Sequence, residues 1–199
     1  MNRKYNIRHL ILASIFIAIG ICLPMMFHSI PKGGNIFLPM HLPAMVVAFF
    51  LPCSFAFAVG FLTPILSSLM TGMPMIAPVP IALILACEIG TYAFVIAALR
   101  KIMFKRQNYF APLLAVLPAL IIGRAISAGL VFLLSRFFGF DMLNPMAFVW
   151  GATVTGVLGI ISQVVLIPPL YHLVIRTIPG WNGQERLTYV HKKNGDTIK

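Results

Sequence analysis

Apolar runs alternate with short polar or proline-rich segments along the first 176 residues of the chain. A helix needs about 20 apolar residues to cross a bilayer, and fewer when it lies inside a bundle. Six runs meet or approach this length, so the pattern predicts an all-α integral membrane protein with a bundle of six transmembrane helices. The expected spans are Arg8–His28, Pro39–Leu51, Ser54–Met70, Pro80–Leu99, Ala111–Ser135 and Pro145–Ile175. Residues 1–176 would form one membrane domain, followed by a polar tail at 177–199.

Composition and charge placement agree with a membrane location. Only 10% of the residues are charged and 60% are hydrophobic, whereas soluble domains carry about 25% charged residues. The net charge is +11, and twelve of the fifteen basic residues lie at the N-terminus, between the fourth and fifth expected spans or near the C-terminus. Lysine and arginine gather on cytoplasmic loops. Both termini and the tail are therefore expected in the cytoplasm, and nucleic acid is not an expected partner.

The stretch GGNIFLPMHLPAMVVAFFLP, residues 33–52, carries helix-breaking and polar residues at the start of an apolar run. It begins in an outer loop, and the segment TGMPMIAPVP forms a second one. Irregular backbone at membrane depth must pack against protein or line a wet cavity. We therefore expect both loops to gate a solute pocket, with Asn35 and His41 facing inward. The expected gating residues are Gly33, Gly34, Pro39, Met73 and Pro74.

Two ionisable residues lie inside the expected spans. Glu88 and Arg124 are each roughly 12–17 Å below the outer surface if a helix rises 1.5 Å per residue. An ionisable side chain at such depth faces the bundle interior and pairs with another group. Two interpretations remain open: a structural ion pair between two helices, and contact with a bound solute.

Other polar side chains share the same region of the expected bundle. Tyr92 is one helical turn from Glu88, and Ser127 is three residues from Arg124. Trp150 is also typical of an anchor at the membrane interface, and Gln163 of a hydrogen bond between helices. The candidate substrate-binding residues are Asn35, His41, Glu88, Tyr92, Arg124, Ser127, Trp150 and Gln163.

Small residues recur at four-residue spacing in the first span, at Ser14, Ala18 and Cys22. Such a pattern lets another helix approach closely. The second helix could belong to this chain or to a partner subunit.

Sequence motifs for energy coupling and catalysis are missing. The chain has no G-x-x-x-x-G-K-[ST] loop, no H-E-x-x-H helix and no G-x-S-x-G turn. Its three cysteines show no metal spacing, so we expect no metal, no cofactor and no enzymatic activity. An intramembrane enzyme using Glu88, Arg124 and His41 remains the alternative from another functional class.

The phrases FLPMHLPAMVVAFFLP, GFLTPILSSLMTGMPM and ALILACEIGTYAF resemble the substrate-binding (S) components of energy-coupling factor (ECF) vitamin importers. The resemblance implies a subunit of a bacterial cell membrane that captures a vitamin at the outer face. It also implies partners: a transmembrane coupling subunit and two ATPases, which together form the ECF module. In that family an AxxxA-like motif of the first span meets the coupling subunit, and Ser14, Ala18 and Cys22 occupy the corresponding positions here.

The vitamin is a separate question. Pantothenate, with one carboxylate, an amide and hydroxyl groups, would suit Arg124 together with Asn35, His41 and Gln163. Cobalamin or its precursors, and pyridoxine or hydroxymethylpyrimidine, remain alternatives. A pyridoxine-like or pyrimidine ring would stack on Tyr92 or Trp150 and hydrogen-bond to Glu88.

Overall fold

The computed structural model describes residues 7–27, 39–77, 80–104, 109–138, 146–147, 150–151, 154 and 156–177. Asn35, Gly33 and Gly34 lie outside the described residues, so their expected roles stay predictions. The regular elements of the described part are all helical: α1 Ile7–Phe27, α3 His41–Ala48, α4 Cys53–Thr71, α5 Ile81–Phe104, α6 Leu113–Phe138 and α8 Val157–Thr177. The all-α prediction is therefore confirmed for this part of the chain.

Five helices of the described chain are long and apolar enough to cross a membrane, namely α1, α4, α5, α6 and α8. The expected count of six spans is not confirmed, because the second expected span is the helix α3 of only 8 residues. At 1.5 Å per residue it covers about 12 Å, well short of the roughly 30 Å of a hydrocarbon core. Seven of its eight residues are buried, so α3 is apolar because it lies inside the protein.

The last expected span also differs from the structure. It was expected from Pro145, but α8 begins at Val157. Residues 145–156 are only partly described. Pro168 and Pro169 lie inside α8, where each removes one backbone donor from the helix.

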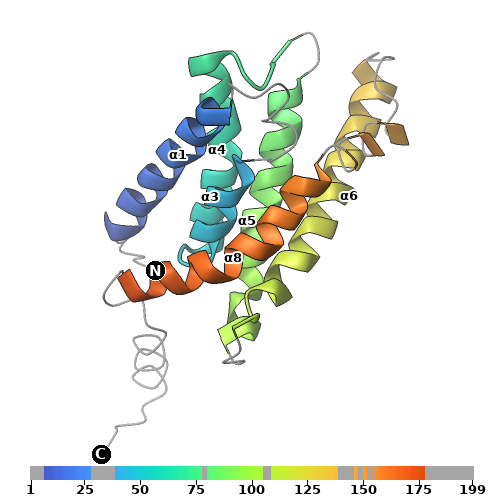
Figure 1. The fold of residues 1–199 in the computed structure, drawn as a ribbon. Coiled ribbons are helices and arrows are strands. Elements are labelled where there is room, and N and C mark those ends of the chain that lie inside the picture. The colour runs from blue at the N-terminus through green and yellow to red at the C-terminus, as the bar shows by residue number, and fades with distance from the viewer. Residues whose placement is uncertain are drawn as a thin grey trace, which may run out of the picture.

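α5 is the central helix of the bundle (Figure 1). In the most apolar stretch of α5, 61% is buried inside the protein. The corresponding share for α1 is 22%, so α1 is peripheral. α4 and α6 pack on α5, and α3 packs against α1, α4, α5 and α8. The approach of α4 to α5 depends on Gly60, because a Cβ there would lie 2.6 Å from the carbonyl oxygen of Ile89. The core thus combines one deeply buried long helix with one short internal helix.

A tight hairpin around Pro52 joins α3 to α4. α3 ends at Ala48, α4 begins at Cys53, and Pro52 lies between them with extended backbone. The buried Arg100 of α5 donates from Nη1 to the carbonyl oxygen of Leu51 at 2.6 Å. Figure 1 shows that α1 begins and α8 ends at this same end of the bundle. Which side of the membrane this end faces stays a prediction.

Candidate solute site

Glu88 and Arg124 were expected at similar depth in the membrane, and in the structure their side chains are in contact. Nη1 of Arg124 on α6 lies 3.1 Å from Oε1 of Glu88 on α5. The Glu88 side chain is 1% exposed and that of Arg124 17% exposed. An ion pair buried to this degree is costly to form, because both charges lose hydration. The structure thus contains the predicted ion pair between Glu88 and Arg124. Contact of this pair with a solute stays a prediction.

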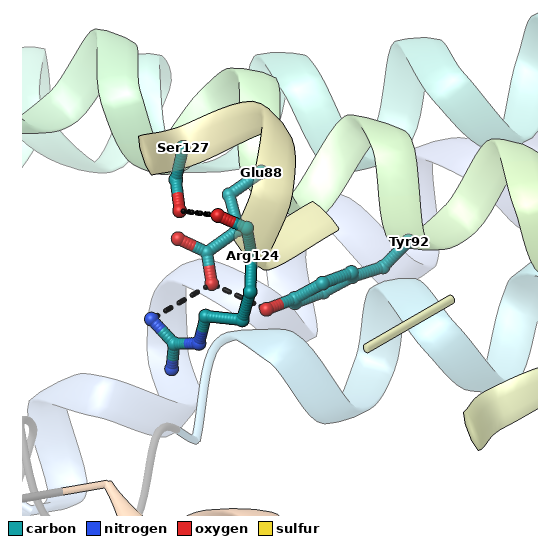
Figure 2. Close-up of polar contacts among 4 residues, drawn as sticks. All are labelled: Glu88, Tyr92, Arg124 and Ser127. Carbon is teal, nitrogen blue, oxygen red and sulfur yellow. Dashed lines mark hydrogen bonds and ion pairs between the residues drawn. The ribbon is translucent and has the colours of Figure 1, made fainter. Parts of the chain in front are cut away.

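Tyr92 and Ser127 complete the polar contacts around this pair (Figure 2). The hydroxyl of Tyr92 donates to Oε1 of Glu88, one turn away on α5. The hydroxyl of Ser127 donates to the backbone carbonyl oxygen of Arg124 at 3.0 Å. The carboxylate of Glu88 thus accepts from a guanidinium and a phenol at a single oxygen, which orients both donors.

His41 joins the cluster from the start of α3. Its ring centroid lies 5.7 Å from that of Tyr92, with the ring planes at 43°, and its side chain is 3% exposed. Three helices, α3, α5 and α6, therefore meet at Tyr92. We call His41, Glu88, Tyr92, Arg124 and Ser127 the polar cluster.

Further polar atoms are buried without a hydrogen-bond partner among the described residues. They are Oε2 of Glu88, Nε of Arg124, and both Oε1 and Nε2 of the Gln163 side-chain amide. Gln163 is 1% exposed and lies on α8, which packs against α3 and α6. A buried polar group without a partner costs about 1–3 kcal/mol. Groups of this kind are candidates for hydrogen bonds with a bound solute.

Trp150, by contrast, is not brought to the polar cluster. It is 68% exposed, which suits the alternative of an interface anchor. A contact between Trp150 and the substrate stays a prediction.

Hydrogen bonds attach the second predicted gate, the loop that contains Met73 and Pro74, to the end of α4. Ser67 donates to the carbonyl oxygen of Met73 at 2.9 Å, and Ser68 donates to that of Pro74. Met73 itself is 54% exposed. On the other predicted gate, Pro39 is buried next to the start of α3. Nothing in the sequence pattern indicated that Ser67 and Ser68 hold this loop.

The predicted docking residues lie on a face of α1 that the described helices do not cover. Ser14, Ala18 and Cys22 are all exposed, and Ser14 donates to the carbonyl oxygen of Leu10 at 3.0 Å. Ala13 and Gly20 of the same helix, by contrast, are buried. The small residues therefore do not serve to pack α1 against the described helices of its own chain.

Gly123 is a further residue of the site, and the sequence pattern did not predict its role. A Cβ at this position would lie 2.0 Å from Cε1 of Tyr92, so the ring occupies the space that a side chain on α6 would take. The available signal was a glycine next to the intramembrane Arg124.

Gly123→Ala is therefore expected to lower the free energy of unfolding by about 1–3 kcal/mol, the usual cost of overpacking a core. Chemical unfolding of the purified protein in detergent measures the change. Gly129→Ala on the same helix is the matched control, because no atom lies within 4 Å of the added Cβ. The control should be neutral or slightly stabilising, since alanine favours a helix by about 1 kcal/mol over glycine. Equal losses in the two variants would contradict this role of Gly123.

Together, the fold and the site describe a helical membrane protein with a buried, charged cluster among its helices. A family model for the ECF transporter, substrate-specific component, matches residues 8–171. The chain belongs to this family, whose members are transporter subunits and not enzymes. No curated protein and no solved structure matched the chain in the corresponding comparisons.

Proposed function

We propose that this protein binds a water-soluble vitamin from the outer side of the membrane and delivers it inward together with a coupling subunit and two ATPases. The observation that carries the proposal is the polar cluster, because ionisable groups buried among membrane helices are costly and as a rule functional. Membership of the substrate-specific family supports the same conclusion. The sequence contains no nucleotide-binding loop, so the energy would come from the partner ATPases.

Pantothenate is the candidate solute that the sequence alone favours. Its carboxylate could bind Nε of Arg124, which has no acceptor among the described residues. Its amide and hydroxyl groups suit the side chains of Gln163, His41 and Asn35. Cobalamin or its precursors, and pyridoxine or hydroxymethylpyrimidine, are the alternative solutes.

The loops at the outer end are proposed as gates, and α1 as the docking helix. His41 and Pro39 connect the first gate to the start of α3, and the second gate is the loop that contains Met73 and Pro74. The exposed small residues Ser14, Ala18 and Cys22 allow a partner helix to approach α1 closely.

A thermal-shift screen of the purified protein against the water-soluble vitamins, without ATP, tests the proposal. A ligand that binds only the folded state stabilises it by about 2.7 kcal/mol at one hundred times its Kd. One vitamin is expected to raise the unfolding temperature and to bind with one-to-one stoichiometry in calorimetry. If no vitamin stabilised the protein at millimolar concentration, the proposal would be refuted.

A further inference from the structure

The polar cluster has balanced charge. Glu88 is the one acidic side chain in the described part of the chain, and Arg124 is its direct partner at 3.1 Å. Arg100, a buried arginine near the other end of α5, is engaged elsewhere, because it donates to the carbonyl oxygen of Leu51. The cluster therefore presents a pair of opposite charges to a solute.

Glu88 also restricts what Arg124 can do. A guanidinium has five N–H donors, and the buried Nε of Arg124 has no acceptor among the described residues. An acceptor oxygen of a solute can bind there. If the solute is an anion, however, the negative charge of Glu88 lies on the same guanidinium and opposes it. Because water is largely excluded from the cluster, this repulsion is weakly screened.

The amide of Gln163 indicates the same class of solute. Both of its polar atoms are buried and lack a partner among the described residues, and an amide offers one acceptor and two donors without charge. It is complementary to hydroxyl, amide or ring-nitrogen groups. α8, which carries Gln163, packs against the helices of His41 and Arg124.

We infer that Glu88 sets the charge class of the solute: by neutralising Arg124 it makes the site select a solute with no net charge over an anion. This inference rests on the proposed function, because it concerns the solute that the subunit binds. It places pantothenate, an anion, behind uncharged vitamins such as pyridoxine, and makes Glu88 a specificity-determining residue.

Matched pairs of probes that differ in charge test the inference on the unaltered protein. We would measure Kd by calorimetry for pantothenate and pantothenol, for nicotinate and nicotinamide, and for pyridoxal phosphate and pyridoxine, within the full vitamin screen. In any pair that binds, the uncharged member is expected to bind at least about tenfold more tightly, which is a free-energy difference of about 1.4 kcal/mol. Tightest binding of an anion or of a cation such as thiamine would overturn the inference and leave the proposed function standing. Failure of every vitamin would overturn both.

Glu88→Gln tests the assignment to this residue. The glutamine keeps the length of the side chain and an acceptor for Tyr92, but it frees the positive charge of Arg124. The ratio of the affinities for the anionic and uncharged members should shift towards the anion by at least about tenfold. Arg136→Gln, which removes an exposed charge from the same helix as Arg124, should leave the ratio unchanged. An unchanged ratio in a folded Glu88→Gln protein would overturn the assignment; if that variant does not fold, the probe pairs on the unaltered protein decide.

Discussion

Arg124→Ala is expected to abolish solute binding and to lower the free energy of unfolding by about 3–5 kcal/mol. The physical reason is that the substitution leaves the carboxylate of Glu88 buried without its cation, and breaking a buried ion pair from one side costs about this much. The same change removes the Nε donor proposed for the solute. Unfolding in detergent measures the first effect, and calorimetry with the vitamin found in the screen measures the second.

Two further variants separate these effects. Arg136→Ala removes an exposed arginine from α6 and should change neither stability nor binding by a measurable amount. The double variant Glu88→Gln with Arg124→Gln leaves no charged side chain in this pair, so it should recover much of the lost stability but not the binding. If Arg124→Ala were as stable as the unaltered protein, the pair would contribute little and its structural role would be wrong.

Ala18→Trp is expected to abolish vitamin uptake by cells that also produce the coupling subunit and the ATPases, while solute binding by the purified protein is retained. The reason is that Ala18 lies on the exposed small-residue face of α1, where an indole ring would keep a partner helix at a distance. Since this face is remote from the described packing of the bundle, the substitution should not disturb the polar cluster. Uptake of the labelled vitamin and calorimetry measure the two properties separately.

Ala125→Trp is the matched control for this experiment. Ala125 is likewise an exposed alanine of a long apolar helix, but it lies on α6. It should leave both uptake and binding close to those of the unaltered protein. Normal uptake in Ala18→Trp would contradict docking at α1, and loss of uptake in both variants would point to a general defect of membrane insertion.

The pairing of Glu88 with Arg124 could be predicted from the sequence because only a few ionisable residues lie within the apolar runs. A charge in the membrane has to find a partner, and the helical rise places these two at similar depth. The position of Tyr92 next to Glu88 followed from helical spacing alone. The role of Gly123 could not be predicted, because it depends on how closely α5 and α6 approach each other.

The short helix α3 shows a second limit of the sequence. Residues 39–51 are apolar, and the pattern of apolar residues is the same for a segment that faces lipid and one buried among other helices. Only the packing of α3 against four helices shows that it is internal. For Trp150, likewise, the sequence left two environments open, and the structure places its side chain in the exposed one.

By itself, the sequence determined that this is an all-helical membrane protein with a few deep polar residues. Hydrophobicity and helical spacing are local properties of the chain, and they are sufficient for both conclusions. The tertiary structure decided which helices are internal, which face of α1 remains open, and how Tyr92 and Gly123 fit together. Those features depend on contacts between residues far apart in the chain, and such contacts arise only when the helices pack.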